Sequence, residues 1–228
     1  MELNGLIVGL GNPGKEYAST RHNYGFMLVE ALVDACARLG QVNKLSGQKD
    51  PYCLWRCSLR GRSSVNWLVA TPLTFMNRSG EAVQRISAYY HIDPDQILVL
   101  HDELDLALGR MKLKIGGGHA GHNGIRSIQQ MLGTPDFYRL RLGIGKPAGH
   151  DSASYVLGRF SAEQQSVLAE TILAAVEGAL LFMKEGMRPA QQFCNGFIPE
   201  SERTAARASD DAANKESRPP APDTAAKT

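Results

Sequence analysis

The sequence of 228 residues is poor in cysteine, carries little net charge and has no long apolar run. Its four cysteines form no C-x-x-C pair, which is typical of buried free thiols in a reducing compartment. A formal net charge of +2 excludes a bulk polyelectrolyte. The longest apolar stretch, residues 172–183, contains Glu177 and is too short to span a bilayer. The first residues lack the basic start of a signal peptide, so we expect a cytoplasmic protein that does not enter a membrane.

Complete nucleotide-binding motifs are also missing. Residues 9–14 match the dinucleotide pattern G-x-G-x-x-G letter for letter. That motif requires a helix to begin at once and an acidic residue about 20 positions later. Here Pro13 stiffens the turn, helical periodicity starts only near Phe26, and the candidate acid Asp34 falls inside that helix. The Walker pattern fails as well, because Glu16 stands where a magnesium-binding hydroxyl is required.

Two further classes of enzyme lack their signatures. No serine lies in the frame G-x-S-x-G of a serine hydrolase, and residues 61–65 fail at the second glycine. His101 and Asp102, with His119 and His122, could be taken for metal ligands. However, His119 and His122 lie three apart in a glycine-rich segment with no H-E-x-x-H frame. We therefore expect water as the nucleophile, no metal and no cofactor.

Stretches with the periodicity of strands and helices alternate along the chain. We expect strands at residues 3–10, 52–59, 65–70, 97–100, 111–115 and 138–144, a turn at 60–63, and helices at 26–39, 77–90, 121–132 and 161–184. This order predicts one α/β domain, residues 1–200, with a central mixed, largely parallel twisted sheet flanked by helices. In residues 201–228 alanine is the only apolar type besides proline, and five bases balance five acids. Such a composition predicts a disordered C-terminal tail.

Four polar clusters stand at the ends of these elements. They are Asn12 with Tyr17, His22 and Asn23; Thr74 to Asn77; His101 to Glu103; and Gly116 to Gly124. Strand ends on one side of an α/β sheet converge, so the four clusters can share one crevice.

These clusters contain the groups for an acid–base hydrolysis. A histidine that acts as general base needs a partner on its other ring nitrogen, and His22 with Asp102 supplies that pair. The amides of Asn12, Asn77 and Asn123 could hold a carbonyl and its developing oxyanion. The alternative is that each asparagine caps a helix and each histidine is a satisfied loop residue.

Basic residues concentrate in one part of the chain. Between positions 110 and 146 stand Arg110, Lys112, Lys114, Arg126, Arg139, Arg141 and Lys146, against the single acid Asp136. Lys112 and Lys114 share a face of one predicted strand, as Arg139 and Arg141 do of another. This zone suits a partner that bears phosphate, and a solvated face is the alternative.

The blocks Ile7 to Gly14, Thr20 to Asn23, Thr74 to Asn77, His101 to Asp105 and Gly116 to Gly124 resemble the bacterial peptidyl-tRNA hydrolase family in order and spacing. The resemblance covers about residues 3–196. It implies hydrolysis of the ester between the tRNA 3′ ribose and a nascent peptide, which frees tRNA for reuse after aborted translation. The partner is then the acceptor stem and peptide of peptidyl-tRNA, and we expect a monomer. A non-catalytic tRNA-binding module is the alternative.

The resemblance also implies roles for individual residues. By the family's pattern His22 activates water, Asp102 orients His22, and the catalytic Asn12 acts with Asn77 and Asn123 to position the substrate. Tyr17 and Met76 would line the peptide channel, His122 would contact substrate, and Lys114 with Arg141 would clamp the tRNA 5′ phosphate. Tyr24 departs from the family, which often has a small residue there, and we expect it to adjust the channel wall.

Overall fold

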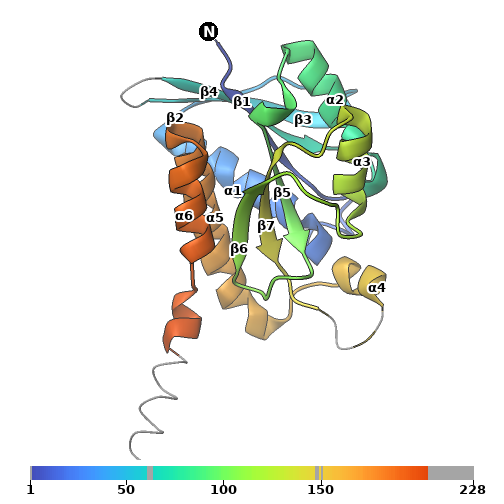
Figure 1. Cartoon of the computed structure of the whole chain (residues 1–228), viewed down its shortest axis with the longest axis vertical. Helices are drawn as coiled ribbons and strands as arrows, with labels where there is room; N and C mark the ends of the chain where they lie inside the picture. Colours follow the sequence, from blue (N-terminus) through green and yellow to red (C-terminus); the bar gives the residue numbers. More distant parts are fainter. Residues whose placement is uncertain (1, 61–63, 147–148, 150, 205–228) are drawn as a thin grey trace, which may run out of the picture.

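The computed structural model describes residues 2–60, 64–146, 149 and 151–204 (Figure 1). Within these residues the strands are β1 (Gly5–Gly9), β2 (Gly40–Lys44), β3 (Tyr52–Leu59), β4 (Val65–Pro72), β5 (Ile97–Glu103), β6 (Met111–Ile115) and β7 (Tyr138–Gly143). They form one sheet in the order β2-β3-β4-β1-β5-β7-β6. The central strands β4, β1, β5 and β7 run parallel, while β2, β3 and β6 are antiparallel to their neighbours. The predicted fold class is confirmed.

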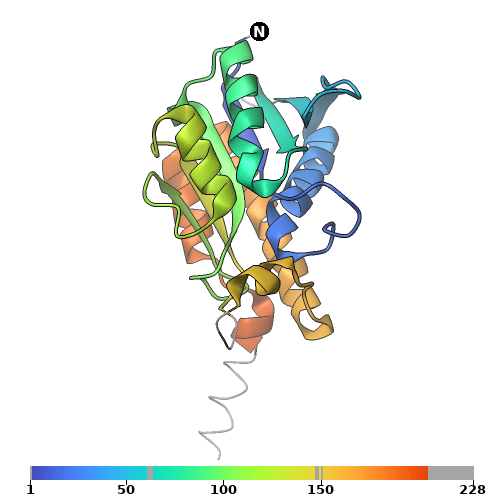
Figure 2. The ribbon, with the colours of Figure 1, turned by 90° about the vertical axis from the view of Figure 1, so that its right-hand side faces the viewer.

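Helices cover both faces of the sheet. They are α1 (Tyr24–Leu39), α2 (Ser79–Tyr90), α3 (Asn123–Leu132), α4 (Ser152–Leu157), α5 (Gln165–Glu185) and α6 (Met187–Gly196), with the short 3-10 turns η1 (Arg21–Asn23), η2 (Met76–Arg78), η3 (Pro94–Gln96) and η4 (Ala162–Gln164). One face carries α1, α5 and α6, and the other carries α2 and α3, which lie in front of the sheet in Figure 2.

The alternation of side chains along the central strands divides the core into two layers. Ile7 of β1 and Leu98 of β5 pack toward α1 and α5, whereas Leu6 and Val8 pack toward α2 and α3. These side chains are at most 1 % exposed. Because successive residues of a strand point to opposite faces, a strand buried on both sides is a continuous apolar run. This is why β1 and β5 could be predicted from sequence.

Some elements differ from the prediction. The strand predicted at 97–100 continues to Glu103, so His101 to Glu103 lie inside β5. Apart from the short 3-10 turns η1 and η3, the described elements that were not predicted are β2, α4 and α6. The side chains of β2 are half-buried or exposed at the sheet edge, α4 has only 6 residues, and α6 contains Pro189 in its first turn. β2 and α4 lack the apolar periodicity on which a sequence prediction depends, whereas α6 has helical spacing of Met187, Ala190 and Cys194 that the prediction overlooked. Residues 61–63 of the predicted turn lie outside the described residues.

Glycines of the apparent nucleotide motif allow α1 to pack close to the sheet. A Cβ atom on Gly9 would lie 2.2 Å from the carbonyl oxygen of Gly25 in α1. A Cβ atom on Gly25 would lie 2.4 Å from both the Leu10 nitrogen and the Leu100 oxygen. Side chains at either position would force the helix away, so these glycines serve helix packing. The close approach carries η1, just before α1, to the end of β5.

The segment from η4 through α5 is apolar and long enough to cross a membrane by length and composition. The sequence prediction had considered only its residues 172–183. In the folded domain half of its most apolar part is buried, with Ala175, Ala179 and Phe182 in the core against α1 and the sheet. Its apolar character is therefore accounted for by packing inside the domain.

The ordered chain continues past residue 200, where the tail was predicted to begin. Residues 200–204 form a helical turn, in which the Glu200 and Ser201 backbone N–H groups donate to Glu170. Glu202 forms an ion pair with Arg110, 2.8 Å between Oε2 and Nη2. These contacts hold residues 201–204 on the domain, which composition alone did not reveal. Residues 205–228 lie outside the described residues, so disorder there stays a prediction.

Candidate active site

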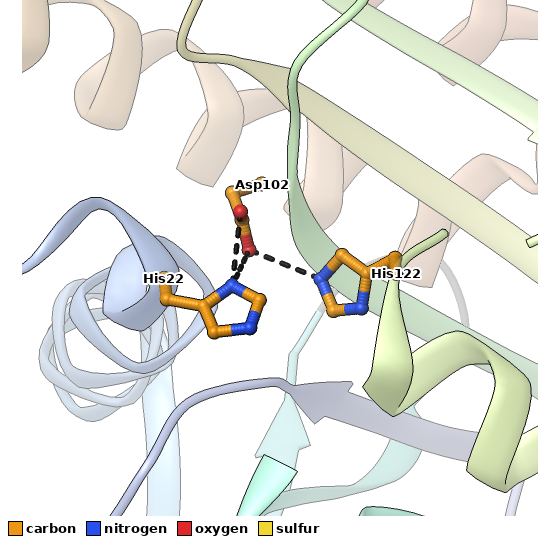
Figure 3. A group of neighbouring side chains, drawn as sticks. All are labelled: His22, Asp102 and His122. Carbon is orange, nitrogen blue, oxygen red and sulfur yellow. Dashed lines mark hydrogen bonds and ion pairs between the residues drawn. The ribbon is translucent and has the colours of Figure 1, made fainter. Parts of the chain in front are cut away.

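The predicted polar clusters meet at the carboxyl end of the parallel strands. Asp102 comes from the end of β5, His22 from η1 on the α1 side, and His122 from the residue before α3 on the other side (Figure 3). They border a cavity of about 350 Å³ that also touches Glu103, Asn123 and α4. The chain thus places its candidate catalytic groups where open α/β folds bind ligands.

The two imidazoles flank Asp102 and share its carboxylate. His22 Nδ1 lies 3.0 Å from each carboxylate oxygen, and His122 Nε2 lies 3.0 Å from Oδ1. The ring centroids of His22 and His122 are 5.0 Å apart. The Asp102 side chain is only 3 % exposed, against 12 % for His22 and 9 % for His122. The predicted His22–Asp102 contact is confirmed, and the structure adds His122 as a second partner.

The hydrogen-bond network assigns the proton on each ring. His122 Nδ1 accepts from the backbone N–H groups of Gly124 and Ile125, so that nitrogen is unprotonated. Its proton therefore lies on Nε2 and is donated to Asp102. His22 Nδ1 likewise donates to Asp102, which leaves Nε2 of His22 with a free lone pair. Of the two rings on the carboxylate, only His22 offers a basic nitrogen that is not already bonded.

Electrostatics keep Asp102 ionised. Burial by itself would raise its pKa, but the N–H groups that His122 and His22 direct at the carboxylate outweigh burial and hold the pKa well below its usual range. Beneath them lies His101, 2 % exposed, whose Nδ1 donates to the Asp102 carbonyl oxygen at 2.7 Å. Burial, reinforced by His122, lowers the pKa of His101 well below its usual value. The site thus combines a buried carboxylate anion with a neutral buried ring.

The side chain of Asn12 is fixed from two directions. Its backbone N–H and carbonyl exchange two 2.9 Å hydrogen bonds with the Asn23 side chain. Its Oδ1 accepts from the Met76 N–H at 2.8 Å. No partner for its Nδ2 occurs among the described residues, so this amide N–H₂ group is its free donor. Asn23 belonged to the first polar cluster, but its supporting role was not predicted, because its partner is identified only by the fold.

The other predicted substrate-binding residues occupy different environments. Asn77 is exposed in η2, and Asn123 is exposed at the start of α3, where its Oδ1 accepts from Arg126 at 2.9 Å. Met76 is 4 % exposed and lies mainly in the core, whereas its neighbour Phe75 is 58 % exposed. Tyr17 is half-buried in the loop after β1 and does not border the cavity described above. Their predicted roles toward substrate remain predictions.

Tyr24 does not adjust a channel wall, so that prediction is wrong. The side chain is 0 % exposed and packs edge-on against Phe160, with 5.4 Å between ring centroids. The first turn of α1 directs it into the core, away from the cavity.

The neighbouring Arg21 has a role that sequence reasoning missed. Its guanidinium lies 4.2 Å from the centroid of the Tyr155 ring and donates to the Tyr155 carbonyl oxygen and to Gln164 Oε1. These bonds tie η1, which carries His22, to the α4 segment that forms one wall of the cavity. The partners lie more than 130 positions away, and the only sequence signal was the adjacency of Arg21 to His22.

The donor atoms of His22, Asp102 and His122 lie within 4.8 Å of one another, close enough to ligate a metal ion. The hydrogen bonds account for this closeness, since both facing ring nitrogens carry protons that Asp102 accepts. The ligand set weighed from sequence is not brought together. His101 Nδ1 donates to a backbone carbonyl, and His119 Nδ1 accepts from the backbone of its own turn. That no metal is required stays a prediction.

One member of the basic zone is buried. Arg139 is 3 % exposed, and its guanidinium donates to the carbonyl oxygens of Gly116, Gly117 and Gly118, at 2.8 Å for the last. Burial, followed by the charge of Arg141, lowers the pKa of Arg139. This cation holds the glycine segment that leads to His122 and is not available to a surface ligand.

The remaining cations of strands β6 and β7 share the same face of the sheet. Lys112 stands opposite Arg141, and Lys114 opposite Arg139, in the antiparallel register. Lys114 is half-buried, and its pKa is lowered by burial first and then by the neighbouring arginines. Three cations of the zone are paired with acids: Arg110 with Glu202, Arg141 with Glu103, and Lys146 with Asp105. The predicted phosphate pair, Lys114 and Arg141, therefore lies on one face.

Comparison with known proteins gives a consistent result. The family model described as peptidyl-tRNA hydrolase matches residues 6–204. A peptidyl-tRNA hydrolase of Nitratidesulfovibrio vulgaris (Miyazaki F strain) is 56% identical over 203 residues, 88% of this chain and 100% of that protein. One of Oleidesulfovibrio alaskensis is 56% identical over 198 residues, 86% and 98% of the two chains. The crystal structure of the peptidyl-tRNA hydrolase from Acinetobacter baumannii superimposes with a TM-score of 0.74 at 40% identity, covering 87% of this chain and 99% of that one.

Proposed function

This chain belongs to the peptidyl-tRNA hydrolase family and hydrolyses peptidyl-tRNA, and on that premise we propose that His22 is its general base. The observation that carries the proposal is the proton assignment of the two imidazoles on Asp102. Of the two, His22 alone keeps an unbonded, unprotonated nitrogen. The alternative of a non-catalytic tRNA-binding module is set aside by the family match.

The proposed reaction begins at the unbonded Nε2 nitrogen of His22. His22 Nε2 removes a proton from water as the water oxygen attacks the ester carbonyl carbon. Asp102 keeps the ring in the Nδ1–H tautomer and stabilises the imidazolium that forms. When the tetrahedral intermediate collapses, the ester bond breaks and the proton passes from His22 to the ribose oxygen. The products are tRNA with a free 3′-terminal ribose hydroxyl and a peptide carboxylic acid, which releases its proton to water at neutral pH.

Asparagine amides complete the proposed site. The Asn12 Nδ2 group is free to donate while its Oδ1 is held by Met76, so the donor is preorganised toward a developing oxyanion. Asn77 and Asn123 are exposed at the starts of helical segments and position the substrate. Exposed Phe75, beside Met76, supplies an apolar surface for peptide side chains, and half-buried Tyr17 in the loop after β1 also contacts the peptide.

The tRNA is held by phosphate contacts rather than by base edges. Lys114 and Arg141 share one face of the sheet next to the cavity and clamp the 5′ phosphate of the acceptor stem. Since this substrate forms during translation, we place the enzyme in the cytoplasm, acting as a monomer.

The decisive experiment follows release of N-acylated amino acid from N-acyl-aminoacyl-tRNA in the presence of EDTA, with non-acylated aminoacyl-tRNA as the substrate control. His22→Ala is expected to lower kcat by on the order of 10²–10⁴-fold, the usual contribution of a general base. His119→Ala is the matched control, because His119 is a loop histidine outside the Asp102 network, and its kcat should stay close to that of the wild type. Near-normal turnover by His22→Ala would contradict this mechanism.

A further inference from the structure

The last residue of β5, Glu103, is bound to the proposed phosphate clamp. Its Oε2 accepts from Arg141 Nε at 2.8 Å, and its Oε1 accepts from the Asp105 N–H at 3.0 Å. The Glu103 side chain is only 8 % exposed. Both carboxylate oxygens are therefore held, and the anion is fixed in one orientation at the edge of the cavity that contains His22.

Arg141 is engaged through one of its five N–H donors only. Among the described residues the bond from Nε to Glu103 is its single side-chain hydrogen bond, so the four N–H groups on Nη1 and Nη2 are unused. The side chain is 18 % exposed. A guanidinium anchored at Nε presents its terminal nitrogens as a preorganised fork, the geometry that suits bidentate binding of phosphate.

We propose that Glu103 is a positioning residue that aims Arg141 at the 5′ phosphate of tRNA. This inference rests on the clamp assigned under Proposed function. A free arginine side chain loses rotamer freedom when it binds, and the Glu103 bond removes much of that loss in advance. Glu103 directly follows Asp102, so the two side chains lie on opposite faces of the sheet. The end of β5 thereby orients His22 through Asp102 on one face and Arg141 through Glu103 on the other.

Electrostatic repulsion and positioning predict opposite effects of the removal of Glu103 on tRNA binding. A carboxylate near a polyanion repels it, so simple repulsion predicts that removal of Glu103 tightens tRNA binding. Positioning predicts weaker binding, and only for tRNA that carries the 5′ phosphate. Glu103→Gln cannot accept both hydrogen bonds, since one end of the amide is a donor. Glu103→Asp keeps the charge but shortens the side chain. Repulsion therefore predicts unchanged tRNA binding in this variant, whereas positioning predicts weaker binding.

The test compares KM and kcat for N-acetyl-aminoacyl-tRNA with its 5′ phosphate and for the same tRNA treated with phosphatase. We expect Glu103→Gln and Glu103→Asp to raise KM for the phosphorylated substrate about five- to tenfold, with kcat and the dephosphorylated substrate little affected. In an Arg141→Ala background the same changes should have no further effect. Asp105→Asn is the control, because it removes one negative charge from a side chain that is 50% exposed and paired with Lys146.

The inference is wrong if KM falls in Glu103→Gln, or if KM rises equally for both substrates. A loss of folding would affect the kinetics of both substrates equally. The ratio of KM between the two substrates therefore reports positioning alone. If the wild type itself does not distinguish the two substrates, the clamp proposed above fails as well. If the wild type and Arg141→Ala differ as expected and only the Glu103 variants do not, the clamp stands and this inference is wrong.

Discussion

At the scale of single residues, the histidines of the site differ in how burial and partners affect their protons. His22 and His122 both donate to Asp102, but only His22 has its second nitrogen free of the backbone. His101 is held neutral by burial beneath them. Three rings of the same chemical type thus lie in three different environments, and the proposed role of His22 as base depends on its environment.

The lowered pKa of His101 predicts a pH-dependent stability. Below pH about 6.5 the unfolded chain binds a proton at this ring while the folded chain does not, so acidification favours unfolding. The loss reaches at most about 1.4 kcal/mol per pH unit for one proton, and it extends down to the depressed pKa of the folded state. His101→Asn keeps a donor in the place of Nδ1 and removes the titration. The free energy of unfolding in urea, measured between pH 7.5 and 5, should fall less steeply in this variant. Equal slopes would show that His101 titrates normally in the folded protein.

At the scale of elements, His122 belongs to the helix as much as to the site. Its Nδ1 caps α3 by accepting from the Gly124 and Ile125 N–H groups, and its Nε2 reaches Asp102 at the end of β5. A single ring thereby joins the start of a helix on one face of the sheet to the carboxylate that orients His22. The position of α3 and the geometry of the His22–Asp102 pair are coupled through it.

Two substitutions separate these roles of His122. His122→Ala removes the cap and should lower the free energy of unfolding by about 0.5–2 kcal/mol. His122→Asn restores a cap but offers no second nitrogen to Asp102, so its stability should stay near that of the wild type. Both variants should lose about tenfold in kcat, equivalent to one hydrogen bond to a charged group. Thermal melts and single-turnover rates measure the two effects, and full activity in His122→Asn would reduce the role of His122 to capping.

At the scale of the whole molecule, the fold sorts a basic stretch of sequence into different tasks. Arg139 is buried on glycine carbonyls, Arg141 is held by Glu103, and Lys114 is half-buried with no acidic partner among the residues described. A net charge of +2 gives little attraction for tRNA in bulk, so we expect the attraction to come from this face.

Salt dependence of tRNA binding tests that distribution of charge. Lys114→Ala should weaken binding and lower the slope of log K against log salt by about one, as for the loss of one phosphate contact. Lys44→Ala removes the same charge from β2 at the opposite edge of the sheet and should leave the slope unchanged. Filter binding with deacylated tRNA between about 50 and 200 mM salt gives both slopes. Equal slopes for both variants would place the clamp elsewhere.

By itself the sequence determined the α/β class and most of the elements, and it predicted the pairing of His22 with Asp102 that the structure contains. These depend on local periodicity and on motifs whose spacing does not change on folding. The elements it did not reveal are β2, α4 and α6: β2 and α4 are short and largely exposed, and α6 follows directly on the long helix α5.

Only the tertiary structure decided how side chains with the same local pattern differ. Arg139 and Arg141 lie two positions apart on the same face of β7. Arg139 nevertheless binds the carbonyl groups of the glycine segment, and Arg141 binds Glu103. Strand alternation predicts the face on which a side chain lies, but its partner comes from the register with a strand elsewhere in the sequence. For the same reason the sharing of Asp102 by His22 and His122, which enter from opposite faces of the sheet, could be known only from the folded chain.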